Sequence, residues 1–238
     1  MRIAVMSDVH GFDLALERVV ADVAAAGPFD EVIVAGDLCE VGPEPARTID
    51  LLQRAGYTAL LGNTDRDIVE AAIAGKADPA AAYVLARIDR SGLDWLADRP
   101  FACRVTPPGA SSTADDLLVV HANPHDLDHK LRPDMSDDEL RDVIGDAAAA
   151  AIAFGHHHVA YIRDLRPPLL VDVSAVGNPK DGDLRSRYGI VTWEEAARRW
   201  RAELRYVDYP IEATVAQIRA SALPHPERVI QKLLAASY

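Results

Sequence analysis

The sequence has few cysteines and no long apolar run, and each shortage excludes a class of protein. Only Cys39 and Cys103 occur among 238 residues, which excludes a disulfide framework and predicts a reducing, cytoplasmic location. The longest strictly apolar stretch, residues 147–154, is far shorter than the roughly 18 residues that span a bilayer, so no membrane partner is expected. The first residues, 1–8, turn polar too early for a secretory signal.

Basic residues are also in short supply. Lys and Arg total 25 against 37 Asp and Glu, which gives a formal net charge of −12. Long nucleic acids need a cationic footprint, so they are not expected as partners. The contents of 49% hydrophobic and 26% charged residues are ordinary for a globular protein. These features predict a protein that acts on something small, and they leave open whether it is a monomer or a homo-oligomer.

The chain begins with a strand–helix–strand pattern. Short apolar runs at residues 2–7, 31–36 and 57–61 alternate with segments of helical spacing, which is typical of a largely parallel sheet. We predict one α/β domain over residues 1–238, with two sheets packed face to face and helices outside. Further strands are predicted at residues 101–105, 117–120, 151–154, 159–164, 169–173, 187–193 and 201–207.

The segment between the two groups of strands is mostly helical by its pattern. Residues 66–98 are predicted to form helices with breaks at Asp78-Pro79 and at Ser91-Gly92. Ser136 and Glu139 match a capping box and predict a helix that runs to about Ala149.

Polar residues follow five of the predicted strands. The carboxyl ends of strands form the ligand crevice in open α/β sheets, so these side chains are expected to converge. Carboxylate and amide oxygens mixed with imidazole nitrogens suit Mn, Fe, Ni or Zn. Seven ligands are too many for one tetrahedral ion and suit two ions that share a carboxylate. The candidates are Asp8, His10, Asp37, Asn63, His121, His156 and His158.

Each candidate alone has an ordinary structural explanation. Asp8 could cap a helix, Gly36-Asp37 and Gly62-Asn63 could be plain strand-to-helix turns, and His121 could be a satisfied core histidine. Their joint occurrence after successive strands favours a metal site. Other polar residues are expected to be bystanders in loops or at the surface, namely Cys39, His125, His129 and His225.

These residues resemble the motifs of the calcineurin-like metallophosphoesterases, specifically the small bacterial and archaeal phosphodiesterases. The resemblance implies a four-layer αββα sandwich of two mixed β-sheets flanked by helices, with a dinuclear metal centre. It implies that Asp8, His10 and His158 hold the first ion, that Asn63, His121 and His156 hold the second, and that Asp37 bridges them. The matching blocks are Asp8-x-His10, Gly36-Asp37-x-x-Glu40, Gly62-Asn63-x-Asp65, His121, Gly155-His-x-His158 and the glycine-containing loop 174–183.

Two divalent transition-metal ions, manganese first and Fe, Ni or Zn as alternatives, would lower the pKa of a bound water and stabilise an in-line displacement. The expected reaction is hydrolysis of a small phosphodiester by a hydroxide that bridges the ions. Asp37, Asn63 and His121 are the expected catalytic residues, and Asn63 and His157 are the expected substrate contacts. Neither a P-loop nor a Gly-x-Ser-x-Gly motif occurs, so their chemistries do not compete.

One position departs from the family pattern. Thr64 stands where many members have a histidine credited with contacting phosphate or protonating the leaving group, and a threonine cannot act as a general acid near neutral pH. Three alternatives stay open: a phosphomonoesterase, a nuclease, which the acidic composition disfavours, and a non-catalytic interaction scaffold of the same fold.

Overall fold

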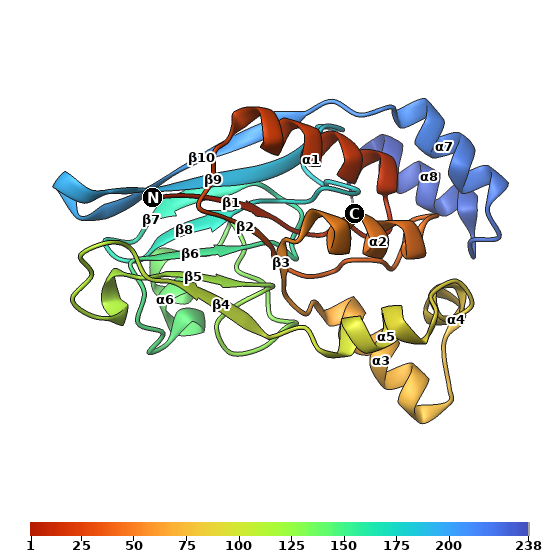
Figure 1. Ribbon diagram of the computed structural model, residues 1–238, viewed down its shortest axis with the longest axis horizontal. Helices are drawn as coiled ribbons and strands as arrows, with labels where there is room; N and C mark the ends of the chain where they lie inside the picture. The colour runs from red at the N-terminus through yellow and green to blue at the C-terminus, as the bar shows by residue number, and fades with distance from the viewer. Residues whose placement is uncertain (238) are drawn as a thin grey trace.

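The structure, a computed structural model, describes residues 1–237, and its strands form two five-stranded sheets (Figure 1). The first sheet has the order β10-β9-β1-β2-β3. Its three early strands are parallel to one another, whereas β9 runs antiparallel to β1 and to β10. Its strands are β1 (Arg2–Met6), β2 (Glu31–Val34), β3 (Thr58–Ala59), β9 (Ser186–Glu194) and β10 (Arg199–Val207).

The second sheet is also mixed, with the order β4-β5-β6-β8-β7. Its central strands β5, β6 and β8 are parallel, and the edge strands β4 and β7 run antiparallel to their neighbours. Its strands are β4 (Ala102–Val105), β5 (Leu117–Val120), β6 (Ala151–Phe154), β7 (Tyr161–Asp164) and β8 (Leu169–Asp172).

Alternating side chains of the strands build three apolar layers, because successive residues of a strand point to opposite faces. Ile3 and Val5 of β1 face the second sheet and share a core with residues such as Val119 of β5. Ala4 and Met6 point the other way, into the core under the outer helices. A third cluster lies between the second sheet and α6.

Helices cover the outer faces of both sheets, which confirms the predicted four-layer αββα sandwich of two mixed β-sheets (Figure 1). None of the helices within residues 1–237 is both long and apolar enough to cross a membrane. The helices are α1 (Asp13–Ala26), α2 (Pro45–Ala55), α3 (Asn63–Ala74), α4 (Pro79–Leu85), α5 (Arg90–Ala97), α6 (Asp137–Ile144), α7 (Ile211–Ala220) and α8 (Pro226–Ala235), with short 3₁₀ turns at Thr113–Asp115 and Glu195–Ala197.

Local side-chain chemistry explains where helices begin and end. The predicted break at Asp78-Pro79 is confirmed, because the Asp78 carboxylate caps α4 by accepting the Ala81 N–H at 2.8 Å. The break predicted at Ser91-Gly92 is wrong. Both residues lie in the first turn of α5, where the Asp89 carboxylate accepts the Gly92 N–H and the Ser91 hydroxyl.

Two other elements, a strand and a helix, are shorter than predicted. The strand expected at residues 57–61 is reduced to Thr58–Ala59. The helix expected to reach Ala149 ends at Ile144, because the next residue, Gly145, leaves helical geometry with φ 59° and ψ −132°. Its N-terminus is as predicted, since Ser136 and Glu139 form the capping box. These differences leave the strand ends that carry the candidate ligands in place.

Candidate metal centre

The structure brings all seven predicted ligands together at the carboxyl ends of the strands. Asp8 and His10 follow β1, Asp37 follows β2, and Asn63 is the first residue of α3. His121 follows β5, and the two remaining histidines follow β6. Two groups of converging ligand atoms result, one of Asp8, His10 and His158 and the other of Asp37, His121 and His156.

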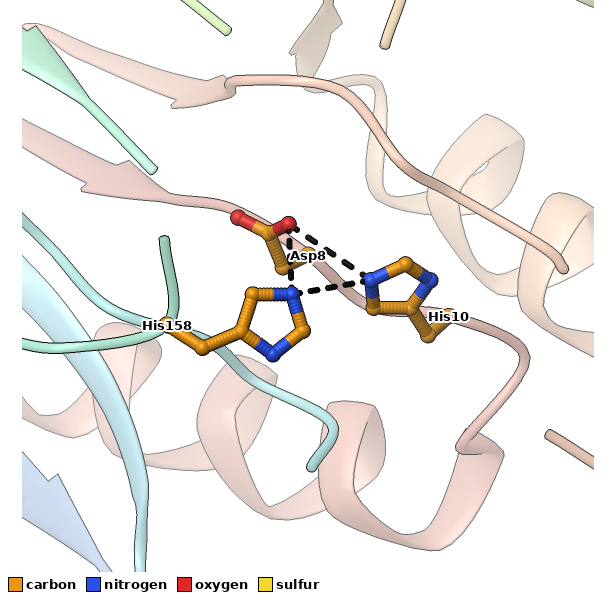
Figure 2. Close-up of side chains that lie close together, drawn as sticks. All are labelled: Asp8, His10 and His158. Carbon is orange, nitrogen blue, oxygen red and sulfur yellow. Dashed lines mark hydrogen bonds and ion pairs between the residues drawn. The ribbon is translucent and has the colours of Figure 1, made fainter. Parts of the chain in front are cut away.

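Figure 2 shows the first group, in which the ring nitrogens of two histidines point at each other. The Nε2 atoms of His10 and His158 are 3.0 Å apart. Each ring is held from behind through Nδ1, which bonds the Glu40 carbonyl at 3.1 Å in His10 and the Asn178 carbonyl at 2.7 Å in His158. A carbonyl only accepts, so each Nδ1 carries the proton and each Nε2 presents a lone pair.

The Asp8 carboxylate completes this first group. Its Oδ1 is buried and accepts no hydrogen bond within residues 1–237, and it lies 3.0 Å from Nε2 of His158 and 3.5 Å from Nε2 of His10. Its Oδ2 accepts the backbone N–H of His156 at 2.8 Å, which ties the first group to the second. Oδ1 of Asp8 and the two Nε2 atoms all present lone pairs, and none of them carries a proton. Three such electron-pair donors fit a divalent cation.

The second group repeats this arrangement with different atoms. His121 bonds the Ala35 carbonyl through Nδ1 at 2.8 Å, whereas His156 bonds the Asp128 carbonyl through Nε2 at 2.9 Å. The free nitrogens, Nε2 of His121 and Nδ1 of His156, are therefore 3.1 Å apart with their lone pairs facing. Oδ1 of Asn63, another acceptor, lies 3.0 Å from Nε2 of His121. This group also fits a cation.

Asp37 faces both groups at once. Its Oδ2 lies 3.6 Å from Nε2 of His10 and its Oδ1 lies 3.5 Å from Nε2 of His121. Oδ1 also accepts the Thr64 backbone N–H at 2.9 Å in the first turn of α3. The positive end of a helix dipole favours a carboxylate there. Asp37 therefore has the position that a bridging ligand needs.

Electrostatics keeps most of these groups in the form that binds metal. Burial lowers the pKa of His156 and of His158, which favours neutral imidazole. Burial would raise the pKa of Asp8, but the charge of His158 and hydrogen bonding hold it well below the usual value. Burial would likewise lower the pKa of His10, but Asp8 and Asp37 outweigh it and raise that pKa. Protons therefore compete with metal most strongly at His10.

Five of the ligands have left-handed backbone conformations, which are uncommon for residues other than glycine. A strained backbone of this kind costs about 1–3 kcal/mol per residue and persists only where the surroundings enforce it. Such residues cluster at functional sites. The φ angles are 53° at Asp8, 53° at His10, 54° at Asp37, 65° at His156 and 59° at His158.

The centre requires glycine at Gly155, where a side chain would strike the Asp8 carboxylate. A Cβ atom there would lie 2.2 Å from Oδ2 of Asp8 and 2.3 Å from Oγ of Ser7. We expect Gly155→Ala to displace Asp8 and to weaken metal binding by about 10–100-fold, the scale of other changes in the support of metal ligands. Metal titration followed by calorimetry measures this effect.

A matched glycine provides the control for that substitution. In α5 a Cβ on Gly92 would have its nearest contact at 3.5 Å. Gly92→Ala should therefore leave metal affinity unchanged and keep or slightly raise the melting temperature. Equal metal affinity in Gly155→Ala and wild type would show that Asp8 is not a ligand.

Sequence reasoning missed the supporting role of Asp65. Both of its carboxylate oxygens accept backbone N–H groups, from Leu38 at 2.9 Å and from Gly62 at 2.9 Å. It therefore joins the loop that carries Asp37 to the start of α3, and burial raises its pKa to about 6. The spacing Gly62-x-x-Asp65 was a signal for this role, because an acidic residue at the third position of a helix reaches back to its N-terminus.

Four other residues considered in the sequence lie outside the two groups of ligand atoms. The Thr64 hydroxyl is buried and has no hydrogen-bond partner within residues 1–237. Burial and the charge of Lys130 lower the pKa of His157 to about 4. Nε2 of His125 bonds the Ile144 carbonyl at 2.8 Å. Burial raises the pKa of Cys39 well above its usual value, so its thiol is a poor nucleophile.

Comparison with known proteins agrees with this geometry. The sequence profile of the calcineurin-like phosphoesterase superfamily domain matches residues 1–196. A metallophosphoesterase from Sphaerobacter thermophilus is 25% identical, with a TM-score of 0.76 over 99% of this chain and 100% of that chain. A hypothetical protein from Pyrococcus horikoshii shares the fold at 14% identity, with a TM-score of 0.82 over 99% of this chain and 98% of that one.

Curated relatives match this chain over only part of their own length. A symmetrical bis(5′-nucleosyl)-tetraphosphatase from Acidovorax sp. is 32% identical over 128 residues, and its counterpart from Paracidovorax citrulli is 34% identical over 129 residues. Each alignment covers 51% of this chain and 44% of the relative. The matched segment thus spans less than half of those enzymes.

Proposed function

Because this chain belongs to the calcineurin-like phosphoesterase superfamily, we propose that it hydrolyses a small phosphodiester with the help of two divalent transition-metal ions. Manganese is the first candidate, with Fe, Ni and Zn as alternatives. The proposed ligands are Asp8, His10 and His158 for one ion, Asn63, His121 and His156 for the other, and Asp37 for both.

One observation carries this proposal: two sets of proton-free donor atoms converge on either side of a single carboxylate. The two facing pairs of imidazole nitrogens are 3.0 and 3.1 Å apart, and Asp37 lies between the pairs. When bound, two ions at such a site would supply an activated water and would neutralise charge on a phosphoryl oxygen.

The chain's own residues orient this chemistry. Carbonyl groups fix the ring orientation of all four histidines, so that each imidazole presents one chosen nitrogen. The amide of Asn63 offers an oxygen toward His121 and keeps an NH₂ group that can donate to a phosphate oxygen. The N-terminus of α3, where Asn63 lies, favours an anion as well. We propose Asp37, Asn63 and His121 as the catalytic residues, and Asn63 and His157 as substrate contacts.

Dinucleoside polyphosphates are a second candidate substrate class. The names of the curated relatives point to them, through a match that is confined to about half of this chain. A non-catalytic scaffold of the same fold is disfavoured, because the ligand positions of both sites are filled.

The test is a panel of mono- and diesters of 4-nitrophenol together with a dinucleoside tetraphosphate. Each compound is incubated with metal-stripped protein and with added Mn, Ni, Zn or Fe. Turnover of the diesters above the monoesters, with about two ions per chain by elemental analysis, supports the proposal. A protein that binds little metal and hydrolyses no activated ester would instead be a scaffold.

Activity should depend on pH through the metal ligands. An imidazole binds metal only when it is neutral, and its unperturbed pKa is about 6.5. We expect bound metal and activity to fall together as the pH drops from about 6 to 5, and the first ion to leave from the group that contains His10, where the pKa is raised. A chelator should abolish activity until metal is returned. Full activity of a metal-free preparation would contradict the metal-site assignment.

A further inference from the structure

A cavity of about 440 Å³ lies between α4 and α8, in the size range of ligand sites. Both helices are at the same end of the molecule in Figure 1. We refer to it as the α4–α8 cavity. Its wall is largely apolar and includes Val41, Pro79, Tyr83, Leu223 and Val229.

The aromatic part of this wall is held in place. The Tyr83 hydroxyl donates to the Pro43 carbonyl at 2.8 Å, and the guanidinium of Arg87 lies 3.5 Å from the centre of its ring. Tyr83 is buried, so its orientation is fixed without a ligand. A preformed apolar and aromatic surface suits a flat ring.

The α4–α8 cavity adjoins the first metal group through two wall residues. The backbone carbonyl of Asn178 accepts the Nδ1 proton of His158 at 2.7 Å, and Asn178 also lines the cavity. On the other side, Val41 follows Glu40, whose carbonyl holds His10 in the same way. The Asn178 side chain is buried, and its Oδ1 has no hydrogen-bond partner within residues 1–237. This oxygen is an unsatisfied buried acceptor in a residue of the cavity wall.

Two cationic side chains line the cavity. Arg228 and Lys232 of α8 line the cavity against one acidic residue, Asp78, whose carboxylate is engaged in capping α4. Neither Arg228 nor Lys232 forms an ion pair with any of residues 1–237. Lys180 interacts electrostatically with Asp8 and Asp37 of the centre and with Lys232 of the cavity wall.

We propose that the α4–α8 cavity binds the half of the substrate that does not leave, and that this half is an apolar ring carrying a further anionic group, the chemistry of a nucleotide. The ring would lie against Tyr83, and the additional anion would meet Arg228 and Lys232. The matched family domain ends at residue 196, so α8 supplies this specificity from outside it. The proposal rests on the phosphoesterase function proposed above.

Two chromogenic esters test it with the same reacting bond. Thymidine 5′-(4-nitrophenyl phosphate) and its 3′-phosphorylated form both release 4-nitrophenol and differ only in the additional anion. In wild type we expect kcat/KM to be about tenfold higher for the 3′-phosphorylated ester. In the double variant Arg228→Gln/Lys232→Gln the ratio of the two kcat/KM values should fall close to one. Arg219→Gln on α7, an exposed arginine paired with Glu227, removes one positive charge outside the cavity and should keep the wild-type ratio.

Binding provides a readout that does not need catalysis. Thymidine 3′,5′-bisphosphate, titrated by calorimetry, should bind wild type and Arg219→Gln equally. It should bind about tenfold more weakly to the double variant and to Ala80→Trp, which fills ring space in the cavity. Equal dissociation constants in all four proteins would overturn the proposal.

The outcomes separate this proposal from the function on which it rests. A wild type that cleaves both esters equally well would retain the phosphoesterase function and overturn the role of the cavity. A wild type that cleaves neither ester with any metal would contradict the function, and the bisphosphate titration would then decide on the cavity alone.

Discussion

Replacing Asp37 with asparagine should lower kcat/KM for an activated diester by about 10³-fold or more, because a bridging ligand supports several kcal/mol of charge stabilisation at both ions. The two oxygens of Asp37 face different groups of ligands, at 3.6 Å from His10 and 3.5 Å from His121. Asparagine keeps the shape but removes the charge that both ions would share. By contrast, His10→Ala removes one ligand of one ion, so weak turnover should survive at high metal concentration.

The measurements are kcat/KM, bound metal per chain and the melting temperature. Asparagine keeps an oxygen that can accept the Thr64 N–H, so the substitution should not unfold the protein, and an unchanged melting temperature would separate catalysis from stability. Asp94→Asn is the matched control, since Asp94 lies on α5, is exposed and pairs with Arg90. Near wild-type rates in both Asp37→Asn and His10→Ala would show that the metal-site assignment is wrong.

The sequence was sufficient to predict the layers and the convergence of the ligands. When the two faces of a strand pack against different cores, successive residues alternate between those cores. In β1, Ile3 and Val5 belong to one core, and Ala4 and Met6 belong to the other. The polar residues after such strands then have to meet at one edge of the sheet. This logic predicted that Asp8 and His158 converge, although they are far apart in the chain, whereas their grouping at one ion was implied by the family resemblance.

Other features depend on geometry that a pattern of residue types does not carry. The left-handed backbone at Asp8, His10 and Asp37 results from tertiary contacts, such as the hydrogen bond from the Asp8 N–H to the Gly36 carbonyl. His156 presents Nδ1 to the centre, whereas His10, His121 and His158 present Nε2. The nitrogen that is presented depends on which ring nitrogen bonds the carbonyl behind it. The Ser91-Gly92 prediction failed because a cap by Asp89 outweighs a local break signal.

The α4–α8 cavity could not be predicted from the sequence either. His225 was expected to be a loop or surface residue, and it does precede α8 in a left-handed conformation, but it also lines this cavity. Tyr83 and Val229 are distant in the chain, and only the packing of α8 brings them to the same cavity. From the sequence alone, an apolar residue in a helix is assigned to the core, whether it contacts another side chain or a ligand.

Leaving-group dependence should be steep in wild type, because none of Thr64, His157 and His125 is suited to protonate the departing oxygen. The Thr64 hydroxyl is too weak an acid to protonate a leaving group near neutral pH, and it is buried. The pKa of His157 is lowered to about 4, so that ring is neutral at pH 7 and cannot donate as an acid. Nε2 of His125 is directed to the Ile144 carbonyl. Negative charge should therefore accumulate on the leaving group.

A series of diesters that differ only in leaving-group pKa tests this expectation under saturating metal. Nitrophenyl diesters should be cleaved well by wild type, and unstrained dialkyl diesters should be nearly inert. Thr64→His adds a group that can donate a proton, and general acids contribute about 10²–10⁴-fold. It should therefore accelerate poor leaving groups far more than good ones and flatten the series, whereas Thr64→Gln, which adds comparable bulk without a titrating proton, should leave the slope steep. A flat series in wild type would mean that another residue already supplies the proton, and His157→Gln and His125→Gln would then identify which of the two it is.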